Sequence, residues 1–222
     1  MSTIYLAPSG HYGSGVRSAP HSILGYRNSL DIQHSRISEI HCGIPLDTVK
    51  SIETTLTGES NYVVLGGDHT ITLGILRAIS TKEKPYLVMF DAHTDEYTDK
   101  KSLDCGNWLK FAKEENVISG MVRHGCRGEK PSSYTIPKNG HIHITVDIDV
   151  LEPSEYGYAS TYNESGGMSL DQLLSSILAV RKKSNASMTA DIVEYDPFKD
   201  MSGAGRFACS QILDTLLSVI DA

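Results

Sequence analysis

The sequence of 222 residues lacks the features of a secreted, membrane-bound or nucleic-acid-binding protein. Its opening, MSTIYLAPSG, has no basic start and reaches Pro8 quickly, so we expect neither a signal peptide nor a membrane span. The longest basic cluster is Arg181 to Lys183, within a formal net charge of -7. This balance argues against nucleic acid as a partner.

Cysteine is scarce and scattered. The four residues Cys42, Cys105, Cys126 and Cys209 include no C-x-x-C pair. Such spacing is typical of free thiols in a reducing compartment rather than of a disulfide framework or a sulfur-ligated zinc site. We therefore expect a cytoplasmic protein.

Linkers, internal repeats and low-complexity tracts are also missing. Because 40% of the residues are hydrophobic, the chain can build one sizeable core, which predicts a single domain over residues 1–222. The oligomeric state is left open, a homo-oligomer included.

Apolar runs alternate with amphipathic segments along the chain. The runs that read as strands are residues 3–8, 61–66, 86–91, 117–122, 141–149 and 187–195. The segments with apolar residues at helical spacing are 46–57, 70–80, 106–116, 169–183 and 210–222. This order predicts an α/β fold, a three-layer sandwich with a mainly parallel sheet between helices. Functional residues should lie at the carboxyl ends of its strands.

The stretch YLVMFDAHTDEYTD (86–99) places Asp91, His93 and Asp95 at alternate positions after an unbroken apolar run. A strand that kept its period of two to its end would point all three to one side. Each alone could be a capping or turn aspartate or a surface histidine. Together they indicate a site, because two neighbouring carboxylates repel each other unless a cation lies between them.

Other predicted strand ends also carry acidic or imidazole groups: Asp68 with His69, Asp147 with Asp149, and Asp191 with Glu194 and Asp196. Ordinary alternatives exist for some of them. Asp68 could cap a helix, and Asp149 and Asp196 could be turn residues before proline. The repetition of such groups at four strand ends favours a shared functional site.

The candidate ligands indicate the kind of metal. They are imidazoles and carboxylates without sulfur: His69, Asp91, His93, Asp95, Asp147 and Asp149. Structural zinc favours cysteine and calcium disfavours imidazole, so two Mn(II) ions fit best, with Asp91 and Asp147 placed to bridge them. Such a pair of ions activates water, which predicts a hydrolase.

Three blocks, GGDHT, DAHTD and DIDVLEP, resemble the signature blocks of the ureohydrolases, the arginase and agmatinase family. VRSAPHSI (16–23), GGMSL (166–170) and DIVEYDP (191–197) resemble further elements of the same family. The likeness covers most of the chain and implies an arginase-like fold. It also implies one manganese on His69, Asp91, Asp95 and Asp147, and a second on His93, Asp91, Asp147 and Asp149.

By the same resemblance, Glu194 matches the carboxylate that holds the substrate's guanidinium, a planar cation suited to a buried acid. Activated water would attack the guanidinium carbon, and Asp95 would accept its proton. Urea and an amine would then leave. A salt bridge to Arg206 is the structural alternative for Glu194.

Three departures from the family pattern are visible, and two of them bear on catalysis and on the substrate. Cys105 stands where the family has a proton-transferring histidine, and His124 is a candidate replacement, with a plain structural histidine as its alternative. Glu152 replaces the last aspartate of the third block, at a position that is not a ligand. The segment 96–146 is also shorter than in free-arginine arginases, whose contacts to the α-amino and α-carboxylate groups lie there.

The shorter segment would leave the entrance of the site more open. A GNWL block (106–109) is also similar to the peptide arginases. Both observations favour an arginine-containing peptide as substrate, with ornithine as the product in the chain. An agmatinase or free-arginine arginase, acting on a small guanidino substrate, is the first alternative. A histone deacetylase-like zinc amidohydrolase is another. A non-catalytic binding module would show eroded ligands, and all six positions are intact.

Overall fold

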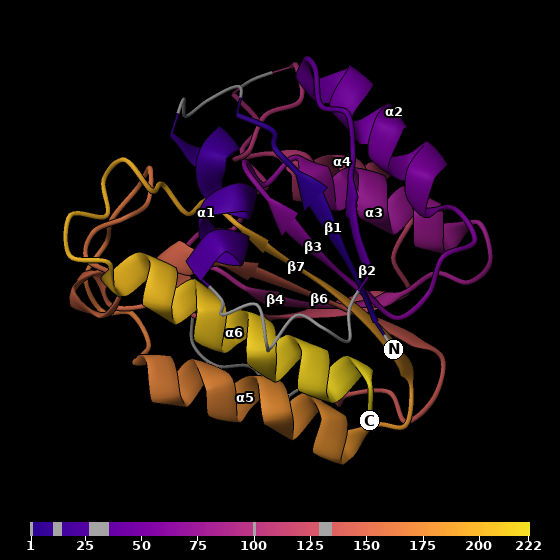
Figure 1. Ribbon diagram of the computed structural model, residues 1–222. Coiled ribbons are helices and arrows are strands. Elements are labelled where there is room, and N and C mark those ends of the chain that lie inside the picture. The colour runs from indigo at the N-terminus through magenta and orange to yellow at the C-terminus, as the bar shows by residue number, and fades with distance from the viewer. Residues whose placement is uncertain (1, 11–14, 27–35, 100, 129–134) are drawn as a thin grey trace.

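A sheet of seven strands lies at the centre of the computed structural model, which describes residues 2–10, 15–26, 36–99, 101–128 and 135–222 (Figure 1). The strand order is β2-β1-β3-β7-β6-β4-β5, and every neighbouring pair is parallel. The strands are β1 Thr3–Ala7, β2 Arg36–Glu39, β3 Tyr62–Gly66, β4 Tyr86–Phe90, β5 Gly120–His124, β6 His141–Asp147 and β7 Ser187–Val193.

Helices cover both faces of the sheet. They are α1 Ala19–Tyr26, α2 Pro45–Leu56, α3 Ile71–Ser80, α4 Trp108–Glu114, α5 Leu170–Lys183 and α6 Ala204–Ile220. α1, α5 and α6 lie on one face, and α2, α3 and α4 lie on the other (Figure 1). The predicted three-layer α/β sandwich is confirmed. The single-domain assignment stays a prediction.

The strands are apolar on both faces because each face is covered by helices. On the face beneath α1, α5 and α6, the apolar side chains form one continuous cluster. The opposite face carries two separate clusters, one where β1 and β3 meet α2 and α3, and one where β4 meets α3 and α4. On this face, β6 and β7 lie between the two apolar clusters.

Among the described strands and α-helices, β2 and α1 were not predicted from the sequence. β2 (RISE) is an edge strand whose residues are largely exposed, so it shows no apolar run. α1 (APHSILGY) is short, with Pro20 in its first turn, where a missing N–H costs nothing. Among the predicted elements, β5 begins at Gly120 rather than at residue 117, and α6 begins at Ala204 rather than at 210.

No helix in the described ranges combines the length and the apolar character that a membrane span requires.

Candidate active site

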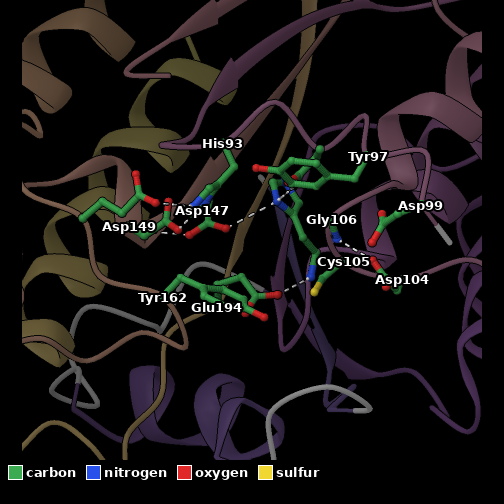
Figure 2. Close-up of a pocket in the computed structure, with 13 residues that line it drawn as sticks. His93, Tyr97, Asp99, Asp104, Cys105, Gly106, Asp147, Asp149, Tyr162 and Glu194 are labelled. Atoms are coloured by element: carbon green, nitrogen blue, oxygen red, sulfur yellow. Dashed lines mark hydrogen bonds and ion pairs between the residues drawn. The ribbon is translucent and has the colours of Figure 1, made fainter. Parts of the chain in front are cut away.

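Four neighbouring strands in the middle of the sheet, β3, β7, β6 and β4, bring their carboxyl ends to one edge. The residues that follow them line a cavity of about 400 Å³ (Figure 2). Six of the predicted site residues are in this lining: His69, His93, Asp95, Asp147, Asp149 and Glu194. Asp91 is fully buried beside them, with Oδ2 3.2 Å from Nδ1 of His69.

β4 ends just before Asp91, and β6 ends at Asp147. β4 ends at Phe90, and Asp91 accepts a hydrogen bond from the backbone N–H of His93 at 2.7 Å. Likewise, the backbone N–H of Asp149 donates to Asp147 at 2.9 Å, where a short 3-10 helix begins. The predicted strand 141–149 therefore ends earlier, at Asp147, and the period of two does not continue from Asp91 to Asp95. Tight turns, rather than strand alternation, bring the side chains together.

Two site carboxylates have left-handed backbone conformations. Asp95 has a φ of 51° and Glu194 a φ of 63°, values that cost a non-glycine residue about 1 kcal/mol or more. Neighbouring backbone groups hold both residues in place. The carbonyl of Asp95 accepts the N–H of Leu109 at 3.1 Å, and the N–H of Glu194 donates to the carbonyl of Gly67 at 2.8 Å. Strain retained at such positions is typical of functional sites.

The donor atoms form two adjacent groups, each within 4.8 Å: His69 with Asp91 and Asp147, and Asp91 with His93 and Asp149. Asp91 belongs to both groups. Asp95 extends the first, since its Oδ2 lies 3.0 Å from Nδ1 of His69. In the second, Nδ1 of His93 lies 3.0 Å from Oδ2 of Asp149. The arrangement offers two cation positions with Asp91 between them, whereas Asp147 falls in the first group alone.

Two buried atoms in this cluster have no hydrogen-bond partner among the described residues: Nδ1 of His69 and Oδ2 of Asp91. An unsatisfied buried polar atom costs about 1–3 kcal/mol. A cation bound between them would satisfy both at once. Imidazole nitrogens and carboxylate oxygens also suit a divalent transition metal. The residues present therefore fit a centre of two metal ions.

Electrostatics supports the same conclusion. Burial and the charge of Asp91 raise the pKa of Asp95 to about 7. Burial and the charge of Asp68 raise the pKa of Glu194 to about 8. Burial and neighbouring aspartates also raise the pKa of Asp147 well above its ordinary value. The protein alone does not compensate this concentration of acids, and bound cations would do so.

Trp108 packs behind the ligands, although sequence reasoning assigned it no contact with them. This fully buried indole donates from Nε1 to Oδ2 of Asp95 at 2.5 Å. Its ring centroid lies 4.7 Å from that of His69. The only tryptophan of the chain therefore orients two candidate ligands, and its position shortly after DAHTD was the available signal.

Glu194 lies across the cavity from the second ligand group (Figure 2). Its Oε1 accepts the backbone N–H of His69 at 2.9 Å. Arg206, the alternative partner considered for Glu194, has its guanidinium 4.9 Å from the ring centroid of Tyr26. The carboxylate of Glu194 is thus placed in the cavity, where a substrate can reach it.

Cys105 lines the cavity at the position where the sequence departs from the family pattern. His124, the candidate replacement for the family's histidine, lies elsewhere. Its ring stacks on Phe90, with centroids 4.8 Å apart, and it is not among the lining residues. This position gives no support to a role for His124 in proton transfer.

Five lining residues were not singled out by the sequence: Tyr97, Asp99, Tyr162 and Glu164, which are exposed at the mouth of the cavity, and Asp104, which is buried. The two tyrosines are 51% and 60% exposed, respectively, so their rings are accessible to a ligand. More than half of the lining residues are Asp or Glu, and none is Lys or Arg. The cavity is built to receive a cation.

Comparisons with known proteins point the same way. The family model described as "Arginase family" matches residues 6–140 and 134–218. The agmatinase of Bacillus cereus is 25% identical over 253 residues, covering 97% of this chain and 87% of that protein. The agmatinase of Neisseria meningitidis serogroup A is 30% identical over 254 residues, covering 93% and 81%. The solved structure of proclavaminate amidino hydrolase from Streptomyces clavuligerus has a TM-score of 0.83 at 18% identity, covering 99% and 91%.

A parallel α/β sandwich with paired imidazole and carboxylate groups at the carboxyl edge of its sheet defines a metal-dependent hydrolase. The chain belongs to the arginase family, whose enzymes act on guanidino C–N bonds. The resemblance drawn from the GGDHT, DAHTD and DIDVLEP blocks is thereby confirmed.

Proposed function

We propose that this enzyme hydrolyses a small guanidino compound without a carboxylate, of the agmatine type, to urea and an amine. The acidic lining of the cavity carries this proposal. The lining acids that are not proposed as metal ligands, Asp99, Asp104, Glu164 and Glu194, would attract a cationic tail and disfavour a free α-carboxylate. The agmatinase relatives support this choice over arginine within a peptide.

The centre would hold two Mn(II) ions. The residues proposed for the first are His69, Asp91, Asp95 and Asp147, and those for the second are Asp91, His93, Asp147 and Asp149. When bound, the ions would supply an activated water molecule and stabilise the charge that develops during hydrolysis.

Glu194 is proposed to bind and orient the guanidinium. A carboxylate has two oxygens with about four acceptor sites, and the backbone N–H of His69 uses one of them. The others remain for a bidentate contact with the planar cation. Because burial raises the pKa of Glu194 to about 8, a bound cation is also what would keep this group ionised near neutral pH.

Asp95 is proposed to accept a proton from the attacking water. Its position supports this role, because its Oδ2 lies beside the first ligand group, 3.0 Å from Nδ1 of His69. The hydrogen bond from Trp108 fixes its orientation. Cys105 and the rim residues would then exclude bulk water once a substrate occupies the cavity.

Arginine within a peptide is the second candidate substrate. It is favoured by the exposed rings of Tyr97 and Tyr162 at the mouth, which offer contact area to residues that flank an arginine. An internal arginine also lacks the free carboxylate that the acidic lining disfavours. Its product would be ornithine in the peptide.

The test compares guanidines of equal chain length that differ only in the charge of the tail. Manganese-loaded protein is incubated with agmatine, butylguanidine and 4-guanidinobutyrate, and urea is measured. We expect kcat/KM to fall in that order as the tail changes from cationic to neutral to anionic. Equal or reversed rates would contradict the proposal.

An arginine peptide with blocked ends and free arginine complete the series. Faster urea release from the peptide than from agmatine would favour the second candidate.

A further inference from the structure

A stripe of polar side chains crosses the sheet on the face beneath α2, α3 and α4. It follows alternate positions of β6 and β7, which pair His141 with Ser187, His143 with Thr189, and Thr145 with Asp191. On this face the polar stripe separates the two apolar clusters. Its inner members, His143, Thr145, Thr189 and Asp191, are completely buried. Burying such groups costs stability unless they are hydrogen bonded, so a polar stripe in place of valine and isoleucine calls for a functional reason.

Asp191 is the centre of the stripe. Its Oδ2 accepts a hydrogen bond from the hydroxyl of Thr72 at 2.9 Å and lies 3.0 Å from Nε2 of His143. Its Oδ1 accepts the hydroxyl of Thr145 at 2.6 Å. Both oxygens therefore have partners, and the carboxylate is fixed from three sides.

Thr145 connects this carboxylate to the candidate metal centre. Its Oγ1 lies 2.9 Å from Nε2 of His69. A threonine hydroxyl has one hydrogen, and here Asp191 accepts it. Toward His69 the hydroxyl can therefore act only as an acceptor, so Nε2 of His69 carries the ring hydrogen.

This direction of hydrogen bonding determines what His69 offers to the cavity. With the hydrogen on Nε2, the lone pair of Nδ1 faces the oxygens of Asp91 and Asp95 at 3.2 and 3.0 Å. A hydrogen on Nδ1 would instead occupy the space between the ring and these carboxylates and would exclude a cation.

We propose that Asp191 and Thr145 are positioning residues that fix His69 as the Nε2–H tautomer, with Nδ1 directed at the first cation site. This inference rests on the proposed metal centre and adds a role for residues that contact neither the cavity nor the substrate. The partner of a ligating histidine commonly fixes the ring in this way, and its loss lowers metal affinity 10- to 100-fold.

The experiment measures Mn(II) binding to metal-free protein by equilibrium dialysis, for wild type and for Thr145→Val. Valine keeps the shape of threonine but removes the acceptor for Nε2–H. We expect the dissociation constant of the tighter site to rise about 10- to 100-fold. Thr145→Ser restores the hydroxyl and should restore the affinity.

Thr189→Val is the matched control. It removes a buried hydroxyl from the same stripe, but Thr189 contacts His141 and His143 rather than Asp191 or His69. We expect this variant to lose stability in urea unfolding while keeping wild-type affinity for Mn(II). If Thr145→Val does not fold, Thr145→Ala provides the same comparison with a smaller side chain.

The outcomes separate this inference from the proposed function. Equal affinities of wild type and a folded Thr145 variant, or equal losses in the Thr145 and Thr189 variants, would overturn the positioning role and leave the metal centre intact. A wild-type protein that binds no Mn(II) would overturn both.

Discussion

The carboxylates of the cavity differ in role because their surroundings differ. Asp91 is shared by both ligand groups; burial opposes its ionised form, but the neighbouring imidazoles of His69 and His93 outweigh this effect and lower its pKa. For Glu194, burial dominates and raises the pKa. Asp91 therefore suits permanent cation binding, whereas Glu194 suits a cation that enters and leaves.

Replacing Glu194 by glutamine should remove the guanidinium anchor and leave the centre in place. Gln keeps the shape and can still accept the N–H of His69, but it loses the negative charge. A charge-assisted hydrogen bond is worth about 1.5–3 kcal/mol, so we expect kcat/KM to fall roughly 10- to 150-fold. Dialysis should still find wild-type Mn(II) content. An unchanged kcat/KM would assign Glu194 a structural role.

At the mouth of the cavity, Glu164→Gln tests whether this carboxylate attracts the positive charge on the substrate's tail. Glu164 is about half exposed, so we expect only a several-fold loss of kcat/KM for agmatine and none for butylguanidine. Glu114→Gln, on the exposed face of α4, is the matched control and should change neither. Equal losses for both substrates would show that Glu164 does not act through charge.

The sequence predicted the residues at the bottom of the cavity better than those at its mouth. His69, Asp91 and Asp147 could be found because acids and imidazoles immediately follow recognisable apolar runs. Tyr97 and Glu164 lie in irregular segments, where no periodicity indicates the direction of a side chain. The polar stripe left a signal that was not used, since HIHITVD alternates polar and apolar residues within a strand buried on both faces.

Among the elements, the turn between β3 and α3 has the strictest steric demands. A Cβ on Gly67 would overlap the carbonyl oxygen of Ser9. The carbonyl of the same glycine accepts the N–H of Glu194, and the N–H of the next residue, Asp68, donates to the hydroxyl oxygen of Ser9 at 3.1 Å. This turn positions His69 and Glu194 together, so its geometry controls both ends of the cavity.

Gly67→Ala should therefore lower both stability and metal affinity. Overpacking of this kind costs about 1–3 kcal/mol in the free energy of unfolding, measured with urea on metal-free protein. Gly25→Ala is the control, since Gly25 lies in α1 with no atom within 4 Å of the added Cβ, and there alanine should stabilise by about 0.5–1 kcal/mol. A stable Gly67→Ala with wild-type Mn(II) binding would contradict this account.

Elements with clear periodicity were predictable, and their ends were not. The central strands showed as apolar runs because two helical layers bury them. A strand ends where a side chain accepts a backbone N–H that the strand would otherwise use, as Asp91 accepts the N–H of His93. This competition between side-chain and strand hydrogen bonds leaves no mark in the hydrophobic pattern. The beginning of α6 at Ala204 was missed for a different reason, because the buried positions of its first turns hold the small residues Gly205, Ala208 and Cys209, which give no strong apolar signal.

At the scale of the whole molecule, folding without metal brings acids together at a cost. Between about pH 4 and 8, the folded state holds protons on Asp95 and Glu194 that the unfolded chain has released, so stability falls as pH rises. His93 acts in the same direction. Hydrogen bonds with Asp149 and Asp91 raise its pKa to about 12, and this contribution is lost as pH rises from about 6.5 toward that value.

We therefore expect the Tm of metal-free protein to decrease steadily from about pH 5 to about pH 9. Saturating Mn(II) should raise Tm most at the alkaline end, because the ions bind ionised ligands. Thermal unfolding followed by circular dichroism, with chelator or with Mn(II), measures both effects. A metal-free Tm that rises over this range would contradict the electrostatic description of the site.

The last strand of the chain, β7, lies in the middle of the sheet. It pairs with β3 on one side and with β6 on the other, so among the described strands it is the one that joins β2-β1-β3 to β6-β4-β5 within the sheet. During translation, His69, Asp91 and Asp147 all leave the ribosome before the strand that holds their two halves together. The proposed centre takes His69 from one half and Asp91 and Asp147 from the other, so a chain that ended before β7 would carry these residues without the strand that brings them together.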